Sequence, residues 1–320
     1  MKLKVGSMPG PRASSAHVVD YLELICLNEG SASVEKMHRI RRSGADNGEE
    51  LAGAQEGEKE DLAIDDWINE IERRKRLCPT AYPFEVSSSG MAIRIVSDFS
   101  EQRRLLYNFC LLATRMNMRS DKVQAGIDGT QLFERISACV SQAYVGPLTK
   151  SIVFGAGAAE PGFKDKIKDL CNQLDEGGNY HAIDATGSDQ KDGKLDIVTW
   201  KPFFDDRPGK IVFFGQCKTG TNWEDSVCHL QPEGFLNKWI SRPSIVSSIG
   251  RMFFVCDIIA ADAWKSRCVD AGIMFDRLRI CSFEEDLTNC LRDEIFQWTQ
   301  SACVSTKINH LAGRLEELNS

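Results

Sequence analysis

Residues 210–220 have the sequence KIVFFGQCKTG, an apolar run that leads directly into Gln216 and Lys218. Isoleucine, valine and phenylalanine favour β-strands, and successive side chains of a strand point to opposite faces. Gln216 and Lys218 therefore share one face, while Cys217 points to the other. This stretch predicts a buried strand that presents two polar groups on one side at its end.

A second strand is predicted from DGKLDIVTW at residues 192–200. Residues 201–209, between the two strands, contain two prolines and a final glycine, which is typical of a connection between antiparallel strands. A turn centred near Asp205 places Asp196 opposite residues 214–216. A carboxylate is therefore expected to converge on the two polar groups of the first strand.

These groups can support metal-dependent hydrolysis. Mg²⁺ prefers oxygen ligands, and the candidates are the carboxylate of Asp196, the amide oxygen of Gln216 and the main-chain carbonyl of Cys217. Lys218 is placed to orient an attacking water or to offset charge on a phosphate. A bound metal would polarise a phosphoryl oxygen and lower the pKa of its water, so the group predicts a phosphodiester-cleaving site. The alternative is that Asp196, Gln216 and Lys218 are ordinary solvated residues at strand ends.

This pattern resembles the PD-(D/E)xK nuclease superfamily, in particular its restriction-endonuclease-like, Mrr-like branch, in which glutamine replaces the acid of the ExK element. The matching residues are Asp196 in KLDIVTW and Gln216-Cys217-Lys218 in FFGQCKTG. The helix predicted from LFERISACVSQAYVG resembles the family's leading helix, whose glutamate can assist the metal site. The resemblance therefore implies Glu134 as a fourth member of the site.

A further helix, predicted at residues 163–174, lies between that leading helix and the strand of Asp196. It is an alternative counterpart of the family's leading helix, with Asp165 or Asp169 in place of Glu134. The sequence leaves both assignments open.

The resemblance covers about residues 128–260 and implies an α/β fold with a restriction-endonuclease-like core, a mixed β-sheet flanked by helices. It implies an endonuclease that uses Mg²⁺ or Mn²⁺ to hydrolyse phosphodiester bonds, with DNA favoured over RNA as the substrate. A role in bacterial restriction or anti-phage defence is expected by analogy. The alternative function is a catalytically inactive, nuclease-like interaction module that binds a partner protein, and assembly into a homo-oligomer is left open.

Two other sites compete with this interpretation. Residues 155–162, GAGAAEPG, suggest a dinucleotide-binding loop, but Glu160 stands where the fingerprint needs a third glycine or alanine, and its carboxylate would face a pyrophosphate. A cysteine hydrolase would pair Cys217 with His229 or His181, yet strand alternation turns Cys217 toward the core. Both alternatives are disfavoured.

The N-terminal part, residues 1–120, contains no pattern of catalytic residues and is interpreted as a mainly helical accessory region before a nuclease-like domain at 121–320. Residues 44–66 are acidic and contain four glycines, which predicts a flexible linker. The first two helices are expected to pack as a pair on the main domain, with a helix-turn-helix DNA reader as the alternative.

Elements predicted in this part are helices at 17–30, 31–43, 67–77 and 98–116 and a hairpin of strands at 82–86 and 92–96. In the C-terminal domain, further strands are predicted at 251–259 and 273–283 and closing helices at 283–298 and 305–318.

The chain has 320 residues, a net charge of −7 and 42% hydrophobic residues, which can fill a substantial core. It contains no apolar segment long enough for a signal peptide or a membrane span, so a cytoplasmic protein without a membrane partner is expected. The twelve cysteines include no CxxC pair and the five histidines form no ligand pattern, which predicts reduced, structural cysteines. The negative charge disfavours a basic DNA-binding domain, although it is compatible with a local basic surface.

Overall fold

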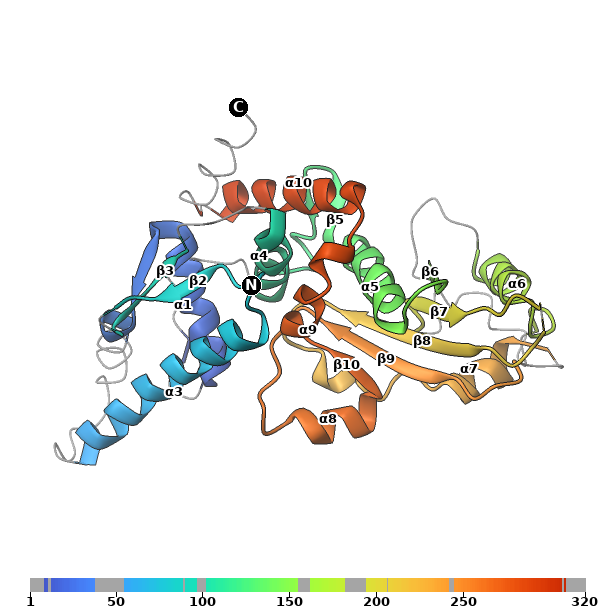
Figure 1. Ribbon diagram of the computed structural model, residues 1–320, viewed down its shortest axis with the longest axis horizontal. Coiled ribbons are helices and arrows are strands. Elements are labelled where there is room, and N and C mark those ends of the chain that lie inside the picture. The colour runs from blue at the N-terminus through green and yellow to red at the C-terminus, as the bar shows by residue number, and fades with distance from the viewer. Residues whose placement is uncertain are drawn as a thin grey trace.

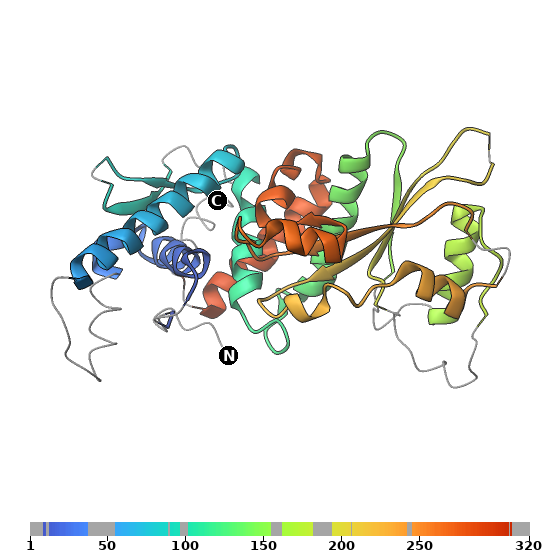
Figure 2. The same ribbon diagram turned by 90° about the horizontal axis from the view of Figure 1, so that it is seen from below.

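The computed structural model describes residues 9–10, 13–37, 55–88, 90–96, 102–154, 162–181, 194–205, 207–241, 245–306 and 308. It shows a mixed α/β architecture, as the sequence predicts. The N-terminal helices lie at one end and a five-stranded sheet lies at the other (Figure 1), and the view from below shows the same arrangement (Figure 2). Within the described residues, no helix is long and apolar enough to cross a membrane.

The five-stranded sheet positions the candidate site. Its strand order is β10-β9-β8-β7-β6. β6, β7 and β8 are antiparallel neighbours, whereas β8, β9 and β10 are parallel, with α7 and α8 as the crossover helices. The carboxyl ends of β8, β9 and β10 therefore lie at the same edge as the start of β7. The bounds are β6 Lys150–Val153, β7 Ile197–Lys201, β8 Ile211–Lys218, α7 Pro232–Trp239, β9 Gly250–Val255, α8 Trp264–Ala271 and β10 Ile273–Phe275.

Helices cover both faces of this sheet. α5 (Gly129–Val145) packs on one face, and α6 (Phe163–Leu174) packs with α7 on the other. Buried apolar side chains alternate between the faces, as the period of a strand requires. The α5 face carries Ile197, Met252 and Phe254, and the α6 face carries Val198, Trp200 and Phe214.

The N-terminal region combines helices with a small antiparallel sheet of order β1-β3-β2. The predicted hairpin is confirmed, because β2 pairs with β3 from Phe84 opposite Ile95 to Val86 opposite Ile93. The C-terminal helix α10 packs against α4. The remaining bounds are α1 Ser15–Glu29, β1 Ser31–Ser33, α3 Gln55–Leu77, β2 Phe84–Val86, β3 Ala92–Ile95, α4 Gln102–Arg115, β4 Val123–Gln124, β5 Ile127–Asp128, α9 Arg277–Cys281 and α10 Asn289–Thr306.

One hydrophobic core crosses the boundary expected at residue 120. It contains Leu22, Trp67 and Phe109 from the N-terminal region together with Phe254 and Trp298 from the C-terminal part. The N-terminal region is thus packed into the same apolar interior as the α5 face of the sheet.

A buried ion network also joins these parts. Three arginines, one each from α3, α4 and α9, donate hydrogen bonds to the carboxylate of Asp20 on α1. The distances are 2.7 Å for Arg74, 2.7 Å for Arg115 and 2.9 Å for Arg277. Burial alone would raise the pKa of Asp20, but the three guanidinium groups hold that pKa well below its usual range. Opposite charge therefore compensates for the removal of this carboxylate from water.

The structure corrects the start of the helix predicted at residues 31–43, of which residues 38–43 lie outside the described residues. Gly30 adopts a left-handed conformation (φ 83°) that ends α1, and residues 31–33 then form β1, which pairs with β3. The helical turn begins only after Ser33, whose hydroxyl accepts a hydrogen bond from the Lys36 N–H. A strand between the helical segments does not fit a helix-turn-helix unit.

The linker prediction at residues 44–66 is wrong for its second half. Residues 55–66 are helical and form the start of α3, because glutamate, glutamine, lysine, alanine and leucine outnumber the helix breakers there. Residues 44–54 lie outside the described residues.

Near the C-terminus, the strand predicted at 273–283 ends at Phe275. Asp276 then caps α9 by accepting a hydrogen bond from the Arg279 N–H, so the second half of that segment is helical. Of the two predicted closing helices, the first corresponds to α10, which starts later, at Asn289. The second, at 305–318, lies almost entirely outside the described residues.

Candidate functional site

Asp196 lies immediately before β7, and the predicted register of the two strands is confirmed. Ile197 pairs with Gly215, so Asp196 lies opposite Gln216. The Asp196 N–H donates to the Gly215 carbonyl at 3.0 Å, and the Cys217 N–H donates to Oδ2 of Asp196 at 2.7 Å. A Cβ atom on Gly215 would lie 2.4 Å from Cγ1 of Ile197, so glycine is needed for this close approach. The carboxylate of Asp196 is thus fixed beside the end of β8 and is buried.

The side chain of Gln216 is buried without compensation. Its exposed fraction is 0%, and neither Oε1 nor Nε2 has a hydrogen-bond partner within the described residues. A buried polar group that lacks a partner costs about 1–3 kcal/mol. Such a group in an otherwise well-packed strand requires an explanation.

Lys218 ends β8 and is partly exposed. Strand alternation places its side chain on the same face as Gln216. Among the described residues, no carboxylate forms an ion pair with its ammonium group. Lys218 therefore brings a positive charge to the sheet edge at which Asp196 lies.

Cys217 points to the opposite face, toward α5. Burial of its thiol raises the pKa well above the usual value, and the carboxylates of Asp196 and Glu134 raise it further. A hydrogen bond with Ser137 and the charge of Lys218 act in the other direction. The thiol is therefore protonated at neutral pH, which does not fit a cysteine hydrolase.

Glu134 lies close to the site, since its charge contributes to the raised pKa of Cys217. Its helix, α5, is capped by Asp128, which accepts hydrogen bonds from the N–H groups of Thr130 and Gln131. Glu134 is half-buried and approaches Cys217 from the α5 face, whereas the side chain of Gln216 belongs to the other face. It is thus close to the strand end without sharing the face of the other candidate ligands.

The alternative acids on α6 are less well placed. Asp165 and Asp169 are both exposed, and Asp165 pairs with Lys168 within its own helix. Both side chains face solvent rather than the sheet. The structure therefore offers more support for Glu134 as the accessory acid.

Two acids at the same edge were missed by the sequence analysis. Asp257 follows β9, where it accepts a hydrogen bond from Nε1 of Trp223 at 3.1 Å. Asp276 follows β10 and is buried. Asp257 comes two residues after β9, in FFVCD, and Asp276 comes directly after β10, in IMFD. An acid at the carboxyl end of an apolar strand is the sequence signal that could have identified both residues. Trp223 is itself buried, so it covers the sheet rather than offering a ring for base stacking.

The candidate metal ligands include a single carboxylate on the sheet face of Gln216, that of Asp196. Among the described residues, no three His, Cys, Asp or Glu side chains are grouped to hold a metal ion. The candidate ligands differ in type, since they include the amide of Gln216 and the main-chain carbonyl of Cys217. In an antiparallel pair, the N–H and C=O of one residue point to the same neighbour, so this carbonyl points toward the start of β7. Oxygen atoms of these kinds are ligands that Mg²⁺ accepts.

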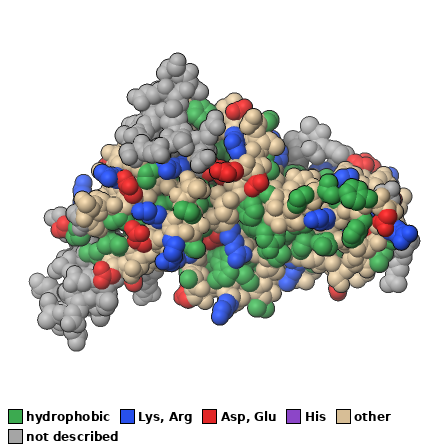
Figure 3. Space-filling view, viewed as in Figure 1, with side chains coloured by type: hydrophobic (Ala, Val, Ile, Leu, Met, Phe, Trp, Pro, Cys, Tyr) green, Lys and Arg blue, Asp and Glu red, His purple; other side chains and the backbone are tan. Residues whose placement is uncertain are grey.

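Surface charge shows no extended basic area on the face seen in Figure 3. Lys and Arg side chains alternate there with Asp and Glu side chains. Contact with a nucleic acid on this face would therefore depend on local groups. The glycine-rich alternative at 155–162 lies, except for Gly162, outside the described residues.

Comparison of the chain with protein-family models, with curated proteins and with solved structures gave no significant match. Function is therefore inferred from the geometry of the site.

Proposed function

We propose that the chain is a metal-dependent nuclease that hydrolyses phosphodiester bonds, with DNA as its preferred substrate. The observation that carries the proposal is the fully buried, unpartnered amide of Gln216 beside the buried carboxylate of Asp196. A cation shared by these two side chains would compensate the amide oxygen, whereas the amide nitrogen has no partner among the described residues.

The architecture supports a restriction-endonuclease-like core for this activity. A mixed sheet with helices on both faces is the kind of core that the resemblance to PD-(D/E)xK nucleases implies. The residues that carry the resemblance occupy adjacent strands, with Asp196 before β7 and Gln216 and Lys218 at the end of β8. Their convergence at one sheet edge is what a shared site requires.

Each residue has a distinct role in the proposal. The oxygens of Asp196, Gln216 and the Cys217 carbonyl would hold Mg²⁺ or Mn²⁺. Glu134, the accessory ligand of the proposal, would have to reach the metal from the α5 face, past the end of β8. Bound there, the metal would polarise a phosphoryl oxygen and lower the pKa of a water molecule. The Lys218 ammonium would orient the attacking water and offset the charge that develops on the phosphate. The N–H of Cys217 fixes the orientation of the Asp196 carboxylate.

The decisive experiment is a cleavage assay on supercoiled plasmid, linear duplex, single-stranded DNA and RNA, with Mg²⁺ or Mn²⁺. We expect Asp196→Ala and Lys218→Ala to reduce cleavage by at least about 10²-fold, because each removes a group that acts on the reacting phosphate. Asp225→Ala and Lys150→Ala, which change exposed residues outside the site, are the matched controls. Cleavage that persists in both site variants would contradict the proposal.

The alternative function is an inactive, nuclease-like module that binds a partner protein. It is favoured by one observation: within the described residues, no three His, Cys, Asp or Glu side chains are grouped to hold a metal. The site has Gln216 in place of an acid, and a neutral amide holds a metal more weakly than a carboxylate. In that case none of the four substrates would be cleaved with either metal, while Gln216→Glu would leave the chain equally inactive.

A further inference from the structure

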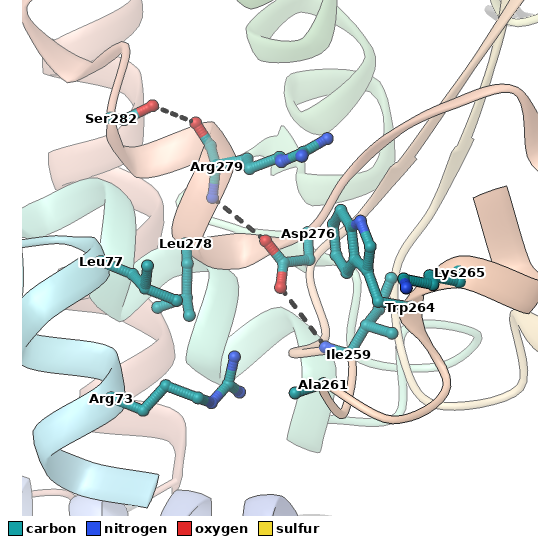
Figure 4. Close-up of a pocket in the computed structure, with 10 residues that line it drawn as sticks. All are labelled: Arg73, Leu77, Ile259, Ala261, Trp264, Lys265, Asp276, Leu278, Arg279 and Ser282. Carbon is teal, nitrogen blue, oxygen red and sulfur yellow. Dashed lines mark hydrogen bonds between the residues drawn. The ribbon is translucent and has the colours of Figure 1, made fainter.

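A cavity of about 370 Å³ lies between the N-terminal region and the sheet. It is bordered by the end of α3, the loop after β9, the start of α8, and α9 with the acid that caps it (Figure 4). It lies outside the carboxyl ends of two parallel strands, β9 and β10. Ligand sites of open α/β sheets lie outside the carboxyl ends of the strands, typically where the strand order reverses; the order β8-β9-β10 does not reverse here. The cavity volume is in the range of small-molecule sites.

The walls of the cavity are largely apolar. Leu77, Ile259 and Leu278 contribute aliphatic surface, and Trp264 contributes an aromatic ring. Leu77 remains 50% exposed, and a ligand in the cavity would bury part of this apolar surface, which stabilises the complex. These side chains form a surface suited to a flat, apolar ring system.

Three basic side chains surround the same cavity. Arg73 reaches it from α3 while paired with Glu70 at 2.7 Å, and Arg279 lies over the ring of Trp264 at 4.4 Å from its centroid. Lys265 is exposed and has no ion-pair partner among the described residues. The local charge therefore favours an anionic ligand, in spite of the net negative charge of the whole chain.

One acid completes the lining. Asp276 is 3% exposed, and its carboxylate accepts hydrogen bonds from the N–H groups of Arg279 at 3.1 Å and Ile259 at 3.4 Å. Figure 4 shows Asp276 at the centre of the lining residues, with Arg73 pointing toward the same space from α3. Each carboxylate oxygen can accept a second hydrogen bond, so Asp276 can also accept one from a ligand N–H group.

We propose that this cavity binds a nucleotide group, with the base against Leu77, Leu278 and Trp264 and the phosphate near Lys265 and Arg73. Exocyclic amino or ring N–H groups of a base are donors that match the acceptor Asp276, and a phosphate matches the surrounding cations. The ligand is either a free mononucleotide or the terminal nucleotide of a nucleic-acid strand. The second option follows from the position of the cavity, which lies at the same end of the sheet as Lys218. The proposal is independent of catalysis at Asp196.

Binding of AMP, GMP, CMP and UMP, and of a 5′-phosphorylated tetranucleotide, to the full chain tests this proposal by isothermal titration calorimetry. We expect saturable binding at one site by at least one probe. Lys265→Glu should weaken that binding at least about tenfold, through loss of a charge-assisted contact, and Ala261→Trp should abolish it by filling the cavity. Binding of a mononucleotide identifies a free ligand, whereas binding of only the tetranucleotide identifies a strand terminus.

Matched variants test whether binding depends on the cavity. Lys150→Glu and Val304→Trp place the same side chains at exposed positions elsewhere and should leave binding unchanged. Thermal unfolding of each variant verifies that it is folded. The proposal is overturned if no probe binds the wild type, or if binding is unaffected by both Lys265→Glu and Ala261→Trp in folded protein.

Discussion

At the scale of single residues, the burial of Gln216 destabilises the fold, and the same residue is a ligand in the proposed metal site. Its amide is fully buried and unpartnered within the described residues, so an apolar side chain of similar shape should be more stable there. We predict that Gln216→Met raises the free energy of unfolding by about 1–3 kcal/mol in the absence of metal and abolishes cleavage. Urea denaturation in EDTA measures the first effect. A gain in stability with a loss of function is typical of an active-site residue.

Gln124 provides the matched control for this substitution. It is also buried, but its amide is satisfied, because Nε2 donates to the Asp121 carbonyl at 3.0 Å and Oε1 accepts from Ser301 at 3.2 Å. Gln124→Met should therefore lower the free energy of unfolding by about 1 kcal/mol for each lost bond. If the two variants were destabilised alike, the amide of Gln216 would have to possess a partner.

At the scale of elements, two helix caps provide a test of opposite pH dependence. Burial raises the pKa of Asp276, the cap of α9. The folded state therefore retains this proton above the unfolded-state pKa of about 3.8, so the contribution to stability falls as the pH rises through the folded-state pKa. Asparagine caps helices as well as aspartate does and carries no charge. We predict that Asp276→Asn gains stability relative to wild type as the pH rises, as measured by denaturation at several pH values above 4.

Asp128, the cap of α5, should show the reverse trend. Partial burial acts to raise its pKa, but hydrogen bonds from Lys122, Thr130 and Gln131 lower it overall. Its contribution is therefore present above the unfolded-state pKa and is lost as the pH falls through the folded-state pKa. Asp128→Asn should accordingly lose stability relative to wild type as the pH rises. Parallel pH trends in the two variants would contradict the opposite pKa shifts.

Elements specified by local sequence were predicted well, and those that depend on distant partners were not. The register of β7 and β8 followed from one short connection, and with it the position of Asp196 opposite Gln216. β1 could not be predicted, because its three residues become a strand only by pairing with β3, some sixty residues later. The burial of Gln216 and the cavity beside Asp276 likewise depend on side chains contributed by separate elements.

At the scale of the whole molecule, the buried carboxylate of Asp20 links the N-terminal region to the sheet. It binds Arg74 of α3 and also Arg277, whose Nε donates to the Cys256 carbonyl at 2.9 Å at the end of β9. The same two parts share one hydrophobic core. Loss of the Asp20 carboxylate should therefore destabilise the sheet as well as α1. The two parts should unfold cooperatively rather than as separate domains.

We predict that Asp20→Asn lowers the free energy of unfolding at pH 7 by about 3–5 kcal/mol. Arg115 and Arg277 lose their nearest carboxylate, whereas Arg74 keeps Glu23 at 2.9 Å and Glu70 at 2.8 Å. Since the folded-state pKa of Asp20 is depressed, the difference from wild type should shrink as the pH falls below about 4 toward that pKa. Hydrogen exchange should accelerate at the amides of β9 as well as those of α1. Glu85→Gln, which breaks the exposed pair with Arg94, should change stability by less than about 1 kcal/mol. Faster exchange confined to the N-terminal region would show instead that the sheet folds independently, as expected for two domains divided near residue 120.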